Sequence, residues 1–284
     1  MKLIAVDLDG TLLSEDCSIS QVNREAIHEV QKQGNIIVIS SGRSFHDTKQ
    51  ILQKAGIECP IISGNGAISF HTEKIIQNFS LPVNVISEMM EILDETNFYY
   101  EIYTRNGILL KQDGRDLLKK EIKYMQEQET GFPEEWAYGE IDIQYNQHGL
   151  LHVPHYQDID FTHLEVYKLF VLSFDKCKLI KLLERVSGRK DISITSSGGT
   201  KLEIGHLDIS KGNALKFMAD YLGIPLEKTV AIGDNLNDLS MFDVAGMSIA
   251  MGNAVEEVKK NGTFITKKHN ENGVAFALRK YILA

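Results

Sequence analysis

The sequence predicts a protein of the α/β class, in which a parallel sheet forms the main body and a second, mixed region is inserted into it. Short, continuously apolar segments alternate with amphipathic segments of helical period toward both ends of the 284-residue chain. Apolar runs of this kind are typical of strands buried on both faces of a parallel sheet. The alternation stops in the middle of the chain and then returns, which indicates two domains.

The first eighty or so residues show the alternation most clearly. The segments KLIAV, NIIVIS and PIIS predict three buried strands. A helix is expected over residues 21–33, where Ser20 is placed to be the N-cap and Gly34 follows the last turn. A second helix is expected over residues 44–55, and Gly56 ends it. This β-α-β-α-β order indicates parallel strands joined by right-handed crossovers.

The same pattern returns after about residue 190. We expect strands in ISIT, TKLEI, TVAIG, MSIAM and TFIT. Helices are expected over residues 212–221, 237–242 and 254–260, and again up to about residue 281.

The middle of the chain differs. It has longer charged helices and isolated strands such as FYYEIY and YKLFVLS, with a hairpin signal at Arg105-Asn106-Gly107. We therefore assign residues 1–82 plus 190–284 to a core domain and residues 83–189 to an inserted α+β domain.

Composition narrows the class of protein. The formal net charge of −9 disfavours nucleic acid as a partner, because a nucleic-acid binder needs clustered Lys and Arg to neutralise phosphates. No apolar run reaches membrane-spanning length, and the three cysteines are unpatterned and odd in number, which suits free thiols in a reducing compartment. We expect a soluble, cytoplasmic protein of undetermined oligomeric state.

Two aspartates directly follow the first predicted strand. Asp7 and Asp9 alternate, so both side chains lie on one side of an extended chain, and Gly10 and Thr11 then turn the backbone. One carboxylate can attack a phosphoryl group and form an aspartyl phosphate. The other can protonate the leaving oxygen and later deprotonate the attacking water. The pair is a candidate catalytic site.

Further polar residues follow other predicted strands or begin helices. Asp234 and Asp238 come four residues apart after TVAIG, and a third carboxylate that converges with Asp7 would suit an oxygen-seeking Mg²⁺. Ser41 and Gly42 lie between a strand and a helix N-terminus, which is a natural anion site.

Three further features of the sequence are weaker evidence for a functional site. Lys211 opens a predicted helix and would bring a point charge to a phosphoryl oxygen. Arg43 either contacts a substrate or holds its loop, and the sequence leaves both possibilities open. Tyr99, Tyr100 and Tyr103 could stack on a substrate ring, although aromatic residues in such a segment are more often ordinary strand residues.

As a set, these residues resemble the haloacid-dehalogenase-like superfamily and, within it, the Cof-type phosphatases. The resemblance covers DLDGT, the serine of ISSGR, the lysine of SKGNAL and the segment GDNLND, with a further match at Asn65-Gly66-Ala67. It implies a Rossmann-like core and a large α/β cap inserted between the second and third motifs, where the irregular middle of the chain falls.

The resemblance also implies a role for each matching residue. Asp7 is the expected nucleophile and a Mg²⁺ ligand. Asp9 is the expected general acid/base, with its backbone carbonyl on the metal, and Asp234 is the remaining carboxylate ligand. The expected phosphate-binding groups are the Leu8 amide, Ser41, Gly42, Lys211 and Asn237, while Asp238 is expected to support the metal ligands.

The sequence thus predicts a Mg²⁺-dependent phosphatase that acts on a small phosphorylated metabolite, such as a sugar phosphate, a phosphorylated cofactor or a nucleotide. A phosphomutase, or a signalling protein that accepts a phosphoryl group on the same aspartate, is the main alternative. A dehalogenase would not need Asp9 as a proton donor to an ester, and a binding protein without activity would not need the reactive groups. The identity of the substrate cannot be read from the sequence.

Overall fold

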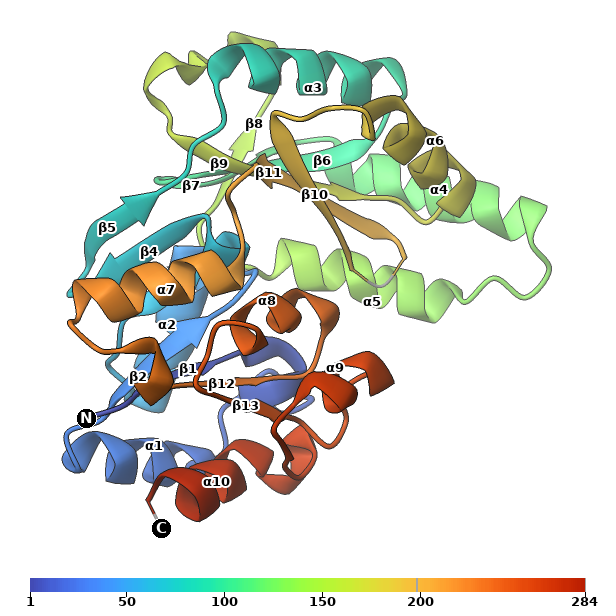
Figure 1. Cartoon of the computed structure of the whole chain (residues 1–284). Helices are drawn as coiled ribbons and strands as arrows, with labels where there is room; N and C mark the ends of the chain where they lie inside the picture. Colours follow the sequence, from blue (N-terminus) through green and yellow to red (C-terminus); the bar gives the residue numbers. More distant parts are fainter. Residues whose placement is uncertain (198, 284) are drawn as a thin grey trace. The chain divides into compact units, whose positions relative to one another are not determined.

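The chain divides into two compact units in the computed structural model, which describes residues 1–197 and 199–283 (Figure 1). Residues 1–78 and 208–284 form the core unit, and residues 79–207 form the inserted unit. The inserted unit ends later than the expected residue 189, because the two strands between residues 190 and 207 pair with the inserted sheet. Residues 190–207 therefore do not belong to the core unit.

The core unit contains an eight-stranded sheet in the order β14-β13-β12-β1-β2-β3-β4-β5. Neighbouring strands from β14 to β3 run parallel, and β4 and β5 continue the sheet with antiparallel pairing. The expected parallel sheet is confirmed. Its strands are β1 (Leu3–Val6), β2 (Ile36–Ser40), β3 (Ile61–Ser63), β4 (Ile68–His71), β5 (Lys74–Asn78), β12 (Thr229–Gly233), β13 (Met247–Ala250) and β14 (Phe264–Ile265).

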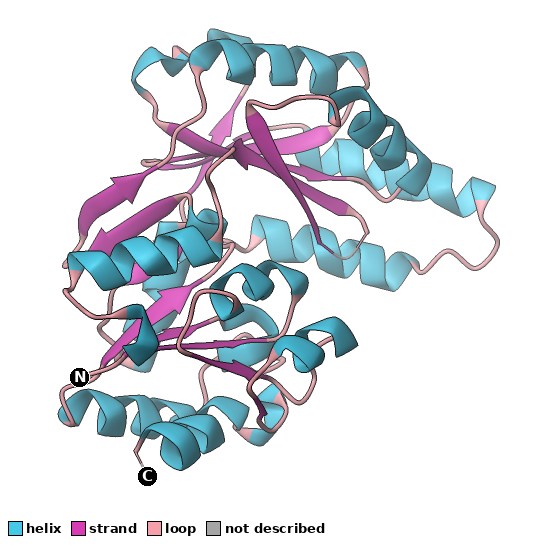
Figure 2. Cartoon of the chain, viewed as in Figure 1, coloured by secondary structure: helices cyan, strands magenta, loops and turns pink. Residues whose placement is uncertain are grey.

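Helices cover both faces of this sheet. Helices α1 and α10 pack together on one face, and α7 and α8 pack together on the other (Figure 2). As expected, Ser20 caps the first helix, because its side chain accepts a hydrogen bond from the Asn23 amide at 3.2 Å. The helices are α1 (Gln21–Lys32), α2 (Phe45–Ala55), α7 (Lys211–Tyr221), α8 (Leu239–Phe242), α9 (Glu256–Asn261) and α10 (Gly273–Ala277).

The inserted unit contains a six-stranded sheet in the order β10-β11-β9-β6-β7-β8. Its strands pair antiparallel except for β7 and β8, and the expected hairpin joins β6 to β7. The strands are β6 (Tyr99–Thr104), β7 (Gly107–Lys111), β8 (Leu150–Val153), β9 (Val166–Leu172), β10 (Ile192–Ser197) and β11 (Lys201–His206). The helices are α3 (Val83–Glu95), α4 (Gly114–Gln128), α5 (Glu134–Tyr145) and α6 (Lys176–Val186).

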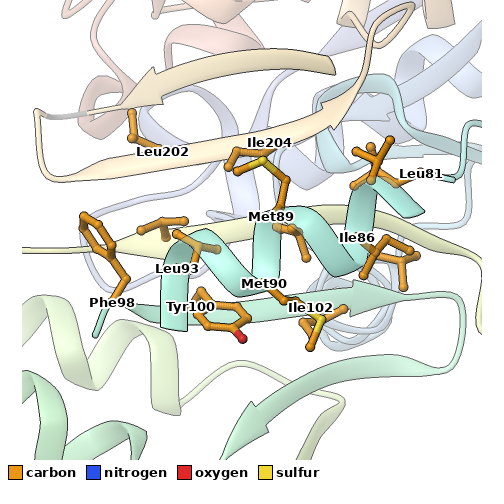
Figure 3. Packing of buried hydrophobic residues seen from close by; sticks show 14 of the residues in the cluster. Leu81, Ile86, Met89, Met90, Leu93, Phe98, Tyr100, Ile102, Leu202 and Ile204 are labelled. Carbon is orange, nitrogen blue, oxygen red and sulfur yellow. The ribbon is translucent and has the colours of Figure 1, made fainter. Parts of the chain in front are cut away.

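One face of the inserted sheet packs against helix α3 in a hydrophobic core (Figure 3). Ile86, Met89 and Leu93 recur at helical spacing and are buried on one side of the helix. They belong to one cluster with Ile102 of β6 and Ile204 of β11. Because side chains alternate along a strand, residues next to Ile102 in the chain point to the opposite face of the sheet.

On that opposite face, Glu101 is a fully buried carboxyl group. The Tyr99 hydroxyl donates to its Oε1 at 2.6 Å, and the Gln147 side chain donates to its Oε2 at 3.4 Å. Burial raises the pKa of Glu101 from 4.5 to about 7, since removal from water disfavours the charged form more than these bonds favour it. The inserted unit therefore contains an acid that titrates near neutral pH.

Replacing Glu101 by glutamine should remove a pH-dependent loss of stability. The native pKa lies above the unfolded value, so the contribution of Glu101 is fully present below about pH 4.5 and is lost as the pH rises toward 7. The free energy of unfolding in urea is measured for both proteins at about pH 5 and about pH 8. The difference between Glu101→Gln and wild type should rise in favour of the variant by on the order of 3 kcal/mol from the lower to the higher pH. Glu127→Gln, at an exposed position of α4, is the control and should show no such change. Parallel pH profiles for wild type and Glu101→Gln would contradict the assignment.

Candidate active site

Three adjacent strands of the core sheet bring the candidate residues to one edge. Asp7 follows β1, Ser41 follows β2 and Asp234 follows β12, and β1 pairs in parallel with both of the others. The carboxyl ends of neighbouring parallel strands meet at the same edge of a sheet, where α/β proteins bind ligands. The sequence placed these residues after strands, and the topology makes those strands neighbours.

The turn after β1 is shaped by its contact with Asp234. Gly10 has φ of +77°, and a Cβ atom there would lie 2.4 Å from Asp234 Oδ2, so only glycine fits. The Thr11 hydroxyl donates to Asp234 Oδ1 at 2.9 Å, and the Asn253 side chain donates to the Gly10 carbonyl at 2.8 Å. The sequence assigned Thr11 only to the turn of the backbone after Asp9, and it gave no role to Asn253. The place of Thr11 in DLDGT is a usable signal, whereas Asn253 carries none.

Lys211 joins two of the carboxylates. It is the first residue of helix α7, its side chain is buried, and its Nζ lies 2.6 Å from both Asp7 Oδ1 and Asp238 Oδ1. Burial acts to lower the pKa of Lys211, but the charges of Asp238 and Asp7 outweigh it and hold that pKa above its usual value. The ammonium group is therefore a fixed positive charge beside Asp7.

Asp238 holds the loop that carries Asp234. Its Oδ2 accepts hydrogen bonds from the backbone amides of Asp234 at 2.9 Å and Asn235 at 3.0 Å, while its Oδ1 contacts Lys211. A Cβ atom on Gly233 would lie 2.4 Å from Asp238 Oδ2, so this position requires a glycine. Asp238 is fully buried, and its expected role of supporting the metal ligands stays a prediction.

The carboxylates form a group that fits a divalent cation. Asp7, Asp234 and Asp238 each offer an oxygen, and these three oxygens lie within 4.8 Å of one another. Three carboxylates and the Lys211 ammonium sum to a formal charge of −2. Burial and then the neighbouring carboxylates raise the pKa of Asp7 well above its usual range and that of Asp234 to about 6. The three carboxylates and Lys211 together therefore carry excess negative charge, which a bound cation would neutralise. Carboxylate oxygens are the kind of ligand that suits Mg²⁺.

The expected phosphate-binding residues are linked through one turn. Asn65, in the left-handed region at φ of +58°, donates from its backbone to the Ser41 carbonyl at 3.0 Å. Its Oδ1 accepts a bond from the Asn237 side chain at 3.0 Å, and a Cβ on Gly42 would lie 3.1 Å from its Nδ2. The turn therefore holds Ser41, Gly42 and Asn237 close together. Phosphate contacts from these three residues, from Lys211 and from the Leu8 amide stay predictions.

The side chain of Asp9 points to a different partner. Arg43 pairs with both oxygens of Asp9 and also with Asp47 in the first turn of α2. Asp9 is not part of the three-carboxylate group, and a metal contact from its backbone carbonyl stays a prediction. The Arg43 side chain therefore bonds both Asp9 and Asp47, and the alternative that it contacts a substrate stays a prediction.

An α/β fold with these groups at the carboxyl edge of its sheet defines a class of phosphoryl-handling hydrolases, and known proteins identify the family. The family model of haloacid dehalogenase-like hydrolases matches residues 4–278. Phosphatase YwpJ of Bacillus subtilis (strain 168) is 34% identical, with 98% of this chain and 99% of the relative covered. The 5-amino-6-(5-phospho-D-ribitylamino)uracil phosphatase YwtE of the same strain is 36% identical, with 97% and 96% covered.

A solved structure agrees with these relatives. The structure of a haloacid dehalogenase-like hydrolase from B. subtilis is similar with a TM-score of 0.86 and 33% identity, covering 99% of this chain and 100% of that chain. The chain belongs to the haloacid dehalogenase-like hydrolase family and is a phosphoric monoester hydrolase. The resemblance inferred from the four motifs is confirmed. Within the described residues, no helix is long and apolar enough to cross a membrane.

Proposed function

We propose that the protein is a Mg²⁺-dependent phosphatase that hydrolyses a small phosphorylated metabolite through an aspartyl phosphate on Asp7. The observation that carries the proposal is the convergence of Asp7, Asp234 and Asp238 around the buried Lys211 at one edge of the sheet. A buried carboxylate next to a fixed ammonium group and other oxygen ligands suits a reaction that must neutralise phosphoryl charge.

In the first step, a carboxylate oxygen of Asp7 attacks phosphorus, and the bond from phosphorus to the ester oxygen breaks. Asp9 gives its proton to that oxygen as it leaves. Lys211 holds Asp7 through Oδ1 and presents its positive charge to the phosphoryl group at the same time. Ser41, the Leu8 and Gly42 amides, and the Asn237 side chain would hold the phosphoryl oxygens.

In the second step, water attacks phosphorus and the bond to Asp7 breaks. Asp9 now accepts the proton of the water, so that one residue acts as acid and then as base. Inorganic phosphate leaves, and Asp7 and Asp9 return to their starting states. Mg²⁺, held by the Asp7 and Asp234 carboxylates and the Asp9 carbonyl, would neutralise charge on the phosphoryl oxygens when bound.

The relatives support a substrate class. YwtE, which is 36% identical, is named for a phosphorylated sugar alcohol attached to a pyrimidine. A sugar phosphate or a phosphorylated cofactor, including compounds of this kind, is therefore the proposed substrate. The candidate residues of the core unit would contact only the phosphoryl group. For this reason we propose that the inserted unit, residues 79–207, determines the substrate specificity.

A phosphate-release screen tests the proposal. Purified protein is incubated with sugar phosphates, flavin and pyridoxal phosphates, nucleotides and 5-amino-6-(5-phospho-D-ribitylamino)uracil, with Mg²⁺ and with a chelator. We expect release of inorganic phosphate from at least one of these esters, lost on chelation and restored by added Mg²⁺. Transfer of the phosphoryl group back to the substrate would indicate a phosphomutase, and a stable phosphoprotein without turnover would indicate a signalling protein.

Replacing Asp9 by asparagine should lower kcat/KM more for substrates whose leaving oxygen is more basic. A sugar phosphate expels a basic alkoxide that needs a proton, so its kcat/KM should fall roughly 10²–10⁴-fold. p-Nitrophenyl phosphate expels a weakly basic phenolate, so its kcat/KM should fall much less. Its second step still lacks a base, and stopped-flow should show a burst of nitrophenol before slow turnover. Equal losses on both substrates without a burst would remove Asp9 from this role.

A further inference from the structure

Arg43 contacts the acid/base residue in a way that the proposed steps do not explain. Its Nε donates to Asp9 Oδ2 at 2.9 Å, and its Nη2 donates to Asp9 Oδ1 at 2.7 Å. Two bonds to both oxygens of a carboxylate fix its orientation as well as its position. A third bond, from Nη1, reaches Asp47 Oδ2 at 2.7 Å.

Arg43 itself is held at several points. Its backbone amide donates to the Ser41 hydroxyl at 3.1 Å, and its carbonyl accepts from the Gly64 amide at 3.1 Å. Its anchor, Asp47, is buried and bonds through its own backbone amide to the Ser44 hydroxyl at 3.2 Å. These contacts place the guanidinium group on the rigid junction between β2 and α2.

Asp9 is by contrast the more exposed partner. The exposed fraction of its side chain is 57%, compared with 19% for Arg43. An exposed carboxylate on a turn is free to sample several rotamers, whereas proton transfer needs it within about 3 Å of the reacting oxygen. The fixed partner is therefore Arg43, and the partner that needs a fixed orientation is Asp9.

We propose that Arg43 is the positioning residue for Asp9: it sets the orientation in which Asp9 exchanges a proton with the leaving oxygen and then with water. The proposal rests on the proposed function. In this proposal the segment that follows β2 has two roles: Ser41 binds the phosphoryl group, and Arg43 binds the acid/base carboxylate. An arginine is required because a lysine cannot bond both oxygens of Asp9 and Asp47 together.

The test compares substrates that differ in their need for a proton. Arg43→Met is assayed for kcat/KM, which covers the steps up to release of the leaving group, on the best sugar phosphate of the screen and on p-nitrophenyl phosphate. We expect a loss of about 10–100-fold on the sugar phosphate and about threefold or less on the aryl ester. Arg43→Lys should fall between Arg43→Met and wild type. Equal losses on the two substrates would overturn the proposal and leave Arg43 a structural residue.

The matched control removes another ion pair between an arginine and a carboxylate in the core unit. Arg279 bonds both oxygens of Glu29, at 3.0 Å from Nε and 2.9 Å from Nη2, on the exposed surface. Arg279→Met should retain wild-type kcat/KM on both esters. If Arg43→Met does not fold, Asp47→Asn is read in the same assay, because it weakens the anchor and leaves Arg43 in place. A smaller loss with the same dependence on the leaving group is then expected, and its absence would overturn the proposal.

A double-mutant cycle separates positioning from direct contact with substrate. Adding Arg43→Met to Asp9→Asn should lower kcat/KM by no more than about twofold further, because the residue being positioned is already inactive. A full additional loss, or a rise in KM with kcat unchanged, would show that Arg43 binds substrate itself. If Asp9→Asn alone has no leaving-group dependence, Asp9 is not the acid/base of the proposed function and this inference fails with that assignment; if only Arg43→Met lacks the dependence, the role of Asp9 stands and this inference alone fails. Absence of phosphate release from every ester in the screen would instead reject the proposed function itself.

Discussion

Asp7→Asn should lower phosphatase activity by at least about 10⁴-fold, the largest effect expected of any single substitution in this chain. The amide oxygen is a poor nucleophile and a weak ligand for Mg²⁺, so the change removes the attacking atom and one metal contact together. Phosphate release under saturating Mg²⁺ and substrate measures the effect. Asp220→Asn, at an exposed position of α7, should keep wild-type activity as the control.

The same variant should fold at least as well as wild type in the absence of metal. Burial and the neighbouring carboxylates hold the pKa of Asp7 well above its usual range, so its charge opposes folding near neutral pH. Removing one of three crowded negative charges relieves that repulsion. Urea unfolding with a chelator present should give an equal or higher free energy of unfolding. Substantial remaining activity, with contaminating phosphatase excluded, would place the nucleophile elsewhere.

Lys211→Met should affect both activity and stability. It removes the only charge partner that the described contacts give to Asp7 Oδ1 and Asp238 Oδ1, and so leaves the three-carboxylate group without an ammonium group. Removing one partner of a buried ion pair costs about 3–5 kcal/mol of stability. The lost charge near the phosphoryl group should cost roughly 10²–10³-fold in kcat. Urea unfolding and phosphate release measure the two effects.

Lys216→Met is the matched control, because this lysine lies in the same helix at an exposed position. It should change neither stability nor kcat. Saturating Mg²⁺ should recover part of the stability of Lys211→Met, since a cation that binds the native carboxylates stabilises the folded state. Wild-type stability in the metal-free Lys211→Met protein would contradict the view that Lys211 neutralises the carboxylate group.

The sequence predicted the parallel core well because its signals are local. Buried parallel strands appear as continuous apolar runs, and the candidate catalytic residues directly follow them. The end of the inserted unit was missed for a related reason. The segments ISIT and TKLEI indicate strands, but they carry no information about which sheet they join, and β10 and β11 pair with β9 through long-range contacts.

Other features depend on tertiary contacts that no local pattern shows. The first helix buries Asn23, whose Oδ1 accepts a bond from the Ala275 amide at 2.9 Å, while the apolar Val22 beside it is exposed. The contact between Arg43 and Asp9 joins residues 34 positions apart. Residue types alone could show that Arg43 lies near the site, but only the folded chain shows which group it holds.

The most direct test of the account is to trap the phosphoryl group on the protein. Asp9→Asn is mixed with p-nitrophenyl phosphate and Mg²⁺, quenched in acid during the burst, and digested for mass spectrometry. The account predicts one added phosphoryl group on the peptide that contains Asp7, in an amount equal to the nitrophenol burst, and none in the Asp7→Asn, Asp9→Asn double variant. A burst without phosphorylation of Asp7, or phosphorylation of another residue, would contradict it.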